Sequence, residues 1–198
     1  RPPLELGGVL YTSREVVDKV ETMKVTTCLN PLHTAMAIYG CMLGYTLISA
    51  EMADDDICTL VQKIGYDEAM PVVTNPGVLD PYEFINEVLN KRFPNPFMPD
   101  TPQRIATDTS QKLAIRFGET IKAYDKAEDL DVADLKLIPL VQAGWLRYMM
   151  GVNDEGEVHL QLIHLSDPLL QGVLTVSAGG NGDASAVITV RAGIGVVV

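Results

Sequence analysis

Apolar residues recur every three or four positions along most of the chain, which is the spacing of amphipathic helices. The pattern predicts a first helix that begins near residue 13, where Thr12 and Glu15 have the spacing of a capping box. Further helices are predicted after residues 54–56 and after the cap Asp80. Another is predicted from near Pro102, with Asp100 or Thr101 as its cap. The last is predicted from Val132 to Met150, with a bend near Pro139.

The most apolar stretch runs from Val25 to Ala50 and contains no Asp, Glu, Lys or Arg. A run of this length could span a bilayer. The polar residues at one end and the lack of a basic cluster or aromatic belt at its flanks favour a central, fully buried helix instead. Gly40 and Gly44 form a GxxxG step, which allows another backbone to approach the predicted helix closely.

Three adjacent acids, Asp54, Asp55 and Asp56, precede one of the predicted helices. Adjacent carboxylates occur in metal sites, but acids in a first helical turn also cap free N–H groups and complement the helix dipole. We interpret these acids as caps.

The composition changes after Pro168 to mostly Gly, Ala, Ser and Val. Residues 169–198 fit two short strands around a Gly-Asn-Gly turn or an irregular tail, and "AGGNGD" is not a dinucleotide-binding fingerprint. The whole pattern predicts a mainly α fold: one multi-helix domain over residues 1–198, built around a buried central helix, with a short β or irregular tail.

The net charge of −11 over 198 residues argues against a general affinity for nucleic acid or anionic lipid, because phosphate binding needs clustered Lys and Arg. This net charge does not exclude a local basic pocket that binds a small anion. The three cysteines, Cys28, Cys41 and Cys58, lie in apolar segments without CxxC spacing, which favours buried free thiols in a reducing cytosol over a zinc site or a nucleophile. No secretion signal is visible, so we expect a cytoplasmic location.

Candidate chemistry gathers where the apolar stretch begins, at Lys24, Asn30 and His33. In a regular helix Asn30 and His33 share a face, whereas Lys24 lies on roughly the opposite side. Pro31 prevents a regular helix, because it has no N–H and its ring crowds the carbonyl of Thr27. Either a bulge turns Lys24 toward the other two, or Asn30 caps a new helix with Pro31 at its first position.

Brought together, these residues would suit proton transfer beside a polar substrate. Burial makes a lysine easier to deprotonate, so Lys24 could act as a general base near neutral pH. Asn30 could donate a hydrogen bond to an oxygen that gains negative charge, and His33 could hold a neighbouring hydroxyl.

Two segments, "MKVTTCLNPLHTAMAIYGCMLGY" and "NPFMPDTPQRIATDTSQKL", carry a resemblance to a known family. They resemble the C-terminal domain of the polyol-specific long-chain dehydrogenases, which include mannitol dehydrogenase and fructuronate reductase (mannonate oxidoreductase). The likeness runs through roughly residues 8 to 165. It implies a mostly helical domain packed against an N-terminal Rossmann domain, which this chain lacks, and metal-independent hydride transfer between NAD and a secondary alcohol.

The resemblance also implies roles for individual residues. Lys24 would be the general base, Asn30 an oxyanion partner and His33 a substrate-orienting group. Arg104 and Lys112 would bind substrate, and the fork of Arg104 would suit the carboxylate of a sugar acid. Alternatively, Arg104 forms a surface pair with Asp108, and Lys112 is a solvated lysine.

The sequence departs from the family in three ways. Lys24 and Asn30 enclose five residues where the family usually has four, and Pro31 stands where a small residue is common. The Rossmann half is not part of this sequence, and the Gly- and Val-rich tail does not match a helical ending.

Three hypotheses follow. The first is the substrate-binding and catalytic part of an NAD-dependent oxidoreductase, inactive by itself, that acts on fructuronate and mannonate or, alternatively, on mannitol and fructose or tagaturonate and altronate. The second is a non-catalytic helical packing or dimerisation module. The third is membrane anchoring through residues 25 to 50. The sequence leaves the substrate, the choice of NAD or NADP and the oligomeric state open.

Overall fold

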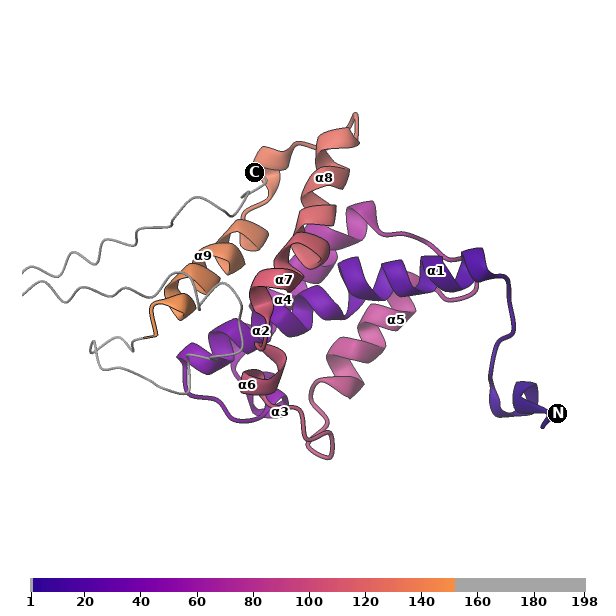
Figure 1. The fold of residues 1–198 in the computed structure, drawn as a ribbon, viewed down its shortest axis with the longest axis horizontal. Helices are drawn as coiled ribbons and strands as arrows, with labels where there is room; N and C mark the ends of the chain where they lie inside the picture. The colour runs from indigo at the N-terminus through magenta and orange to yellow at the C-terminus, as the bar shows by residue number, and fades with distance from the viewer. Residues whose placement is uncertain (1, 152–198) are drawn as a thin grey trace, which may run out of the picture.

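The computed structural model describes residues 2–151, and every regular element within them is helical (Figure 1). This confirms the mainly α prediction, while the predicted strands in residues 169–198 lie outside the described residues. The α-helices are α1 (Arg14–Met23), α2 (Asn30–Met42), α3 (Ile48–Glu51), α4 (Asp55–Lys63), α5 (Pro81–Glu87), α6 (Pro102–Ile105), α7 (Thr109–Leu113), α8 (Glu119–Lys126) and α9 (Leu137–Met149).

Helix α2 is the buried centre of the domain, as the apolar stretch predicts. Leu32, Met36 and Ile38 are 0% exposed, and α3, α4, α6 and α9 all pack against this helix. The helix ends at Met42 rather than continuing to Ala50, and Gly44 follows with a φ of 79°. No helix within residues 2–151 is long and apolar enough to cross a membrane.

The predicted caps are mostly confirmed. The Asp54 carboxylate accepts hydrogen bonds from the backbone N–H groups of Asp56 and Ile57, and Asp80 accepts one from Glu83 N–H. Ser13 rather than Thr12 caps α1, so the first helix begins one residue later than the capping-box spacing predicts. No group of three His, Cys, Asp or Glu residues in the described part of the chain is placed to hold a metal ion.

Two predicted helices are wrong in extent. The helix expected from Pro102 is divided into α6 and α7, because Asp108 between them has a φ of 56° and a left-handed conformation that a helix does not admit. The last helix begins at Leu137 instead of Val132. Pro139 therefore lies in the first turn of α9. At this position its missing N–H would have no carbonyl partner within the helix, so no bend is required.

Four α-helices continue directly into π-helical turns, which widen the backbone by one residue per turn. These turns are Lys24–Cys28 after α1, Ile64–Ala69 after α4, Val88–Arg92 after α5 and Ala114–Gly118 after α7. Such turns often occur at functional sites. Two of them, at Lys24 and at Ala114, border the candidate site described below.

Gly40 permits a close contact, although Gly40 and Gly44 do not form a helical step. A Cβ atom at Gly40 would lie 2.0 Å from Oε1 of Glu51, whereas one at Gly44 would meet nothing within 4 Å. The close neighbour of Gly40 is thus a side chain, Glu51 at the end of α3, and not another helix backbone.

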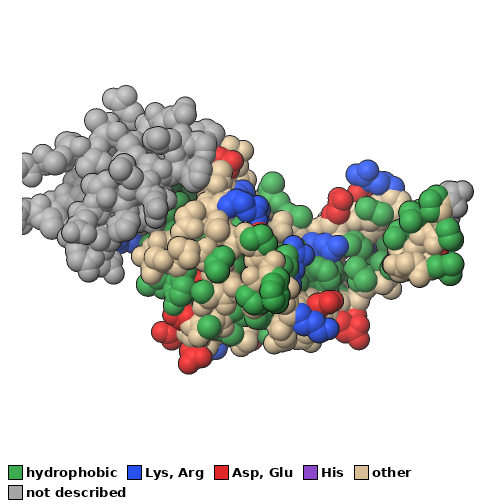
Figure 2. Space-filling view, turned by 90° about the horizontal axis from the view of Figure 1, so that it is seen from below, with side chains coloured by type: hydrophobic (Ala, Val, Ile, Leu, Met, Phe, Trp, Pro, Cys, Tyr) green, Lys and Arg blue, Asp and Glu red, His purple; other side chains and the backbone are tan. Residues whose placement is uncertain are grey.

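The segment before α1 extends away from the helical body (Figure 1). It carries exposed apolar side chains, with Leu6 88% and Leu10 62% exposed. Figure 2 shows apolar side chains gathered at this extended end of the molecule.

The start of α9 depends on a side chain from a distant part of the chain. The buried carboxylate of Glu68 accepts hydrogen bonds from the N–H groups of Lys136, Leu137 and Ile138 at 2.6, 2.7 and 2.8 Å. It caps α9 in the way that an N-terminal Asp or Ser would.

Replacing Glu68 with alanine should lower the free energy of unfolding by about 3 kcal/mol, because three buried donors would lose a charged acceptor. Urea denaturation followed by circular dichroism measures this. Glu128→Ala, at an exposed acid, is the control and should change stability by less than about 0.5 kcal/mol. Equal effects of the two substitutions would show that Glu68 does not support α9.

Candidate functional site

His33 lies in the first turns of α2, between an aromatic ring and a carboxylate. Its imidazole stacks on Phe93, with ring centroids 5.1 Å apart and an interplanar angle of 29°. Its Nε2 is 3.7 Å from Oδ2 of Asp100, which is too long for a hydrogen bond, and this buried nitrogen has no hydrogen-bond partner among residues 2–151. The ring is therefore fixed in place with one polar atom still available.

Burial lowers the pKa of His33 to about 4. Asp100 opposes this shift, while the positive charges of Arg92, Arg116 and Arg104 add to it. The imidazole is neutral near pH 7, so it can exchange a hydrogen bond with a hydroxyl group but cannot attract an anion as a charge. Positive charge at this site comes from the arginines.

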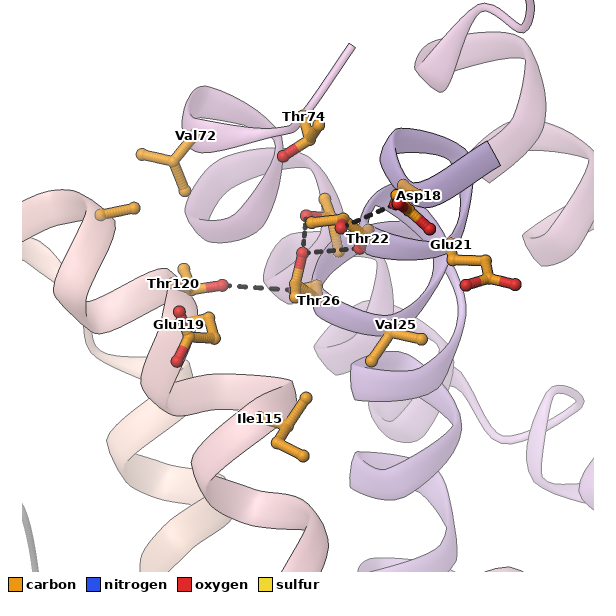
Figure 3. Close-up of a pocket in the computed structure, with 12 residues that line it drawn as sticks. Asp18, Glu21, Thr22, Val25, Thr26, Val72, Thr74, Ile115, Glu119 and Thr120 are labelled. Atoms are coloured by element: carbon orange, nitrogen blue, oxygen red, sulfur yellow. Dashed lines mark hydrogen bonds between the residues drawn. The ribbon is translucent and has the colours of Figure 1, made fainter. Parts of the chain in front are cut away.

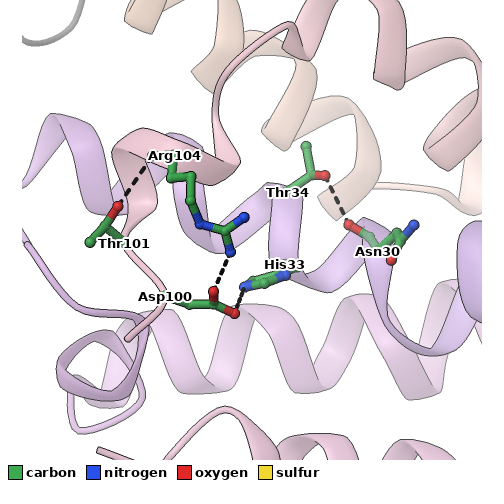
Figure 4. A network of polar contacts seen from close by, with 6 residues as sticks. All are labelled: Asn30, His33, Thr34, Asp100, Thr101 and Arg104. Carbon is green, nitrogen blue, oxygen red and sulfur yellow. Dashed lines mark hydrogen bonds and ion pairs between the residues drawn. The ribbon is translucent and has the colours of Figure 1, made fainter. Parts of the chain in front are cut away.

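Arg104 pairs with Asp100 and not with Asp108, so the predicted surface pair is wrong. Its Nη2 donates to Oδ1 of Asp100, the same carboxylate that faces His33 (Figure 4). Thr101 caps α6 by accepting a hydrogen bond from Arg104 N–H, and the left-handed backbone of Asp108 begins a separate helix. Asp100 thus connects two predicted site residues, His33 and Arg104.

Asn30 opens α2, and Pro31 follows in its first turn. The Thr34 hydroxyl donates to the backbone oxygen of Asn30 at 2.8 Å (Figure 4). The same hydroxyl accepts a hydrogen bond from Nη1 of Arg116, which comes from the π-helical turn after α7. Arg116 is therefore anchored at the start of α2, one residue from His33.

Lys24 begins the π-helical turn between α1 and α2. A π-helical turn precedes Pro31, and a new helix starts at Asn30. The N-cap of this helix is Leu29, so the expectation that Asn30 caps it with Pro31 at the first position is wrong. The ammonium group of Lys24 is 5.3 Å from the centroid of the Phe84 ring. Within residues 2–151 no hydrogen bond or ion pair links Lys24 to His33.

Lys112 holds the loop between α6 and α7. Its Nζ donates to the carbonyl oxygens of Ile105, at 3.1 Å, and of Thr107. These contacts stabilise the turn around Asp108, directly after the helix that carries Arg104. Binding of substrate by Lys112 stays a prediction.

A separate pocket of about 530 Å³ lies between α1 and α8 (Figure 3). Its walls include three carboxylates, from Asp18, Glu21 and Glu119, together with several threonines. Hydrogen bonds join Thr26 to Thr22, and Thr120 to the backbone oxygen of Thr26. Acidic walls would repel an anion, so this pocket does not suit a sugar acid.

The cysteines lie outside the site. Cys28 and Cys41 are buried free thiols as predicted, and burial raises the pKa of each to about 12. Cys58 is only partly buried and accepts a hydrogen bond from Gln62. Neither buried cysteine has the thiolate character that a nucleophile needs.

Residues 16–194 match the family model described as "Mannitol dehydrogenase C-terminal domain". The chain belongs to this family. The match confirms the resemblance that the sequence indicates around Lys24 and Arg104.

Several relatives of this mannitol dehydrogenase C-terminal domain are oxidoreductases. The chain is 59% identical over 175 residues to D-mannonate oxidoreductase from Thermotoga maritima, covering 87% of this chain and 32% of the relative. It is 30% identical over 191 residues to mannitol dehydrogenase 2 from Saccharomyces cerevisiae, covering 96% and 36%. The chain thus spans about a third of the length of the curated relatives that it matches.

A solved structure shows the same fold. A Pseudomonas fluorescens mannitol 2-dehydrogenase, in a ternary complex with NAD and D-mannitol, matches with a TM-score of 0.70 and 24% identity. The match covers 86% of this chain and 32% of that one. It confirms that the helical arrangement is that of the mannitol dehydrogenase C-terminal region.

Sequence reasoning missed several residues that this domain brings to His33. The sequence indicates Asp100 only as a cap, and it does not mark Phe93, Thr34 and Arg116 as site residues. Phe93 and Asp100 flank the proline-rich segment "PNPFMP", which returns the chain to α2. Arg116 lies 82 residues from Thr34, its hydrogen-bond partner, so no local spacing could reveal the contact.

Proposed function

We propose that the chain is the substrate-binding and catalytic part of an NAD-dependent oxidoreductase that interconverts a keto sugar acid and its alcohol, with fructuronate and mannonate as the preferred pair. One observation carries the choice of a sugar acid. Among residues 2–151, the charges of Arg92, Arg104, Arg116 and Asp100 affect the pKa of the partly buried, neutral His33, in a chain whose net charge is −11. A local excess of positive charge in an acidic protein suits an anionic substrate.

The relatives support this choice. The relative at 59% identity is named a D-mannonate oxidoreductase, whereas the relative at 30% identity is named a mannitol dehydrogenase. The more similar of these two thus acts, by its name, on an acid. Mannitol and fructose, or altronate and tagaturonate, are the alternative substrate pairs.

In the proposed reaction Lys24 removes the proton of the substrate hydroxyl, while a hydride passes to NAD from the carbon that bears this hydroxyl. Asn30 donates a hydrogen bond to the oxygen that gains negative charge. His33, fixed on Phe93 with a free Nε2, orients a neighbouring hydroxyl. The π-helical turn at Lys24–Cys28 supports the role of Lys24, because such a turn can absorb the extra residue before Asn30.

NAD would be held mainly by a Rossmann domain outside this chain, and a lysine base needs no metal. The exposed apolar side chains of Leu6 and Leu10 support contact with such a domain, since an apolar surface of this kind usually marks an interface. The proposed partners are therefore the sugar acid and the Rossmann part of the same protein. The chain alone would be inactive.

The test is an assay of NADH oxidation by the full-length protein with fructuronate, tagaturonate and fructose. We expect kcat/KM for fructuronate to exceed that for fructose by roughly 100-fold or more, because a site built for a charged group rejects a substrate that lacks it. Residues 1–198 alone, assayed under the same conditions, should show no turnover. If the full-length protein reduces none of the three compounds, the proposed function is wrong.

A further inference from the structure

Arg116 is a partly buried cation for which residues 2–151 supply no acidic partner. It lies in the π-helical turn Ala114–Gly118, and burial lowers the pKa of its guanidinium group. It forms none of the ion pairs between the described residues. Removing a guanidinium from water without pairing it is unfavourable, so an anion from outside residues 2–151 would stabilise it.

The Thr34 hydroxyl fixes the position of this guanidinium. Thr34 is 0% exposed, accepts a hydrogen bond from Nη1 of Arg116 and donates one to the backbone oxygen of Asn30. A buried hydroxyl with two partners cannot turn freely. The guanidinium of Arg116 is therefore held at the first turns of α2, at the residue that follows His33.

Arg104 is less suited to bind an anion than Arg116. Its side chain is 64% exposed, and its guanidinium already contacts the carboxylate of Asp100. A substrate carboxylate would have to compete with Asp100, and water would screen the pair. Arg116 is more buried, and no acid within residues 2–151 would have to be displaced from it.

We infer that Arg116, held by the Thr34 hydroxyl, binds the carboxylate of the substrate and thereby selects a sugar acid over an uncharged polyol. The inference rests on the proposed function and names the residue that decides its substrate class. Arg104 then contacts the hydroxyl groups shared by acids and polyols. A planar guanidinium with several free N–H groups can bind both carboxylate oxygens at once.

Equilibrium binding to the full-length protein with NADH, which cannot accept a hydride from an alcohol, tests the inference, with D-mannonate and D-mannitol as a matched pair of probes. Isothermal titration calorimetry should show that Arg116→Gln weakens mannonate binding roughly 10- to 100-fold, the loss of a charged hydrogen-bonded pair. Mannitol affinity should stay within about twofold, because mannitol has no carboxylate. Arg104→Gln is the control and should weaken both ligands alike.

Two further variants test the inference in case Arg116→Gln misfolds. Arg116→Lys keeps the charge without the fork and should cause an intermediate loss of mannonate affinity. Thr34→Val removes the anchoring hydroxyl at similar volume and should also weaken mannonate more than mannitol. If Arg116→Gln does not fold, these two variants decide the question.

Three results would overturn the inference: no binding of mannonate by the wild-type protein, equal losses for both ligands, or unchanged mannonate affinity. Unchanged affinity with a lowered Tm would indicate that a protein carboxylate from outside residues 2–151 is the partner of Arg116. The proposed function fails separately. Arg116-dependent mannonate binding without turnover of any substrate would refute the reaction and keep the inference, whereas turnover with Arg116-independent binding would refute the inference alone.

Discussion

Replacing Lys24 with alanine should lower kcat of the full-length oxidoreductase by about 100- to 10,000-fold, the range that a positioned general base contributes. Lys24 begins the π-helical turn that leads into α2, and its ammonium group lies 5.3 Å from the centroid of the Phe84 ring. If Lys24 removes the hydroxyl proton of the substrate, the alanine side chain of the variant cannot replace it. KM should change much less than kcat, because the loss falls on the transition state.

The control for this substitution is Lys19→Ala, because Lys19 pairs with Glu15 on the surface of α1. It should leave kcat unchanged. Added primary amines small enough to enter the space of the missing side chain should restore part of the activity of Lys24→Ala and none of any loss in Asn30→Ala. Full activity of Lys24→Ala would exclude the lysine as the base.

Amine rescue also separates chemistry from structure. The contact between Lys24 and Phe84 is worth only about 0.5–1 kcal/mol at a partly exposed position, so its loss should lower Tm slightly. A large fall in Tm without amine rescue would mean that Lys24 supports the fold near Phe84 and takes no part in proton transfer.

The sequence predicts the fold well where the signal is local. Asp54, Asp80 and Thr101 were recognisable as caps because a cap acts within three residues of itself. The buried centre at α2 was recognisable from an uncharged apolar run. The division at Asp108 was not, because no periodic pattern marks a left-handed aspartate; Lys112 stabilises this turn through hydrogen bonds to Ile105 and Thr107, seven and five residues before it.

The candidate site was only half visible for the same reason. Asn30 and His33 are close in sequence, so one motif could place both on α2. Asp100 and Arg116 reach α2 from two other parts of the chain, and only the packing of α6 and the π-helical turn at Ala114–Gly118 brings them there. Chemistry that depends on such long-range packing leaves no periodic pattern.

A second expected result concerns Glu51, which is 0% exposed and has no hydrogen-bond partner in the described part of the chain for either carboxylate oxygen. It packs directly against the backbone of Gly40 in α2. Burial raises its pKa to about 9, so the carboxyl group is protonated in the folded protein at neutral pH. In the unfolded chain it would lose its proton near pH 4.3.

The sign of the pH dependence follows from proton uptake. Between about pH 4.3 and about pH 9 the folded state holds one more proton at Glu51 than the unfolded state, so stability falls as pH rises. The slope is at most about 1.4 kcal/mol per pH unit, which gives a loss of up to about 3 kcal/mol between pH 6 and pH 8.5. Above the folded-state pKa the contribution stops changing.

Glu51→Gln should remove this slope, because an amide of the same shape stays neutral throughout the range. The difference in unfolding temperature between the variant and the wild type should be small near pH 4 and should grow from pH 6 to pH 8.5, as measured by differential scanning calorimetry. Glu128→Gln, at an exposed acid, should leave the wild-type slope intact. Parallel curves for wild type and Glu51→Gln would mean that Glu51 is ionised in the folded protein, and that a cation from outside residues 2–151 or solvent reaches the space beside Gly40.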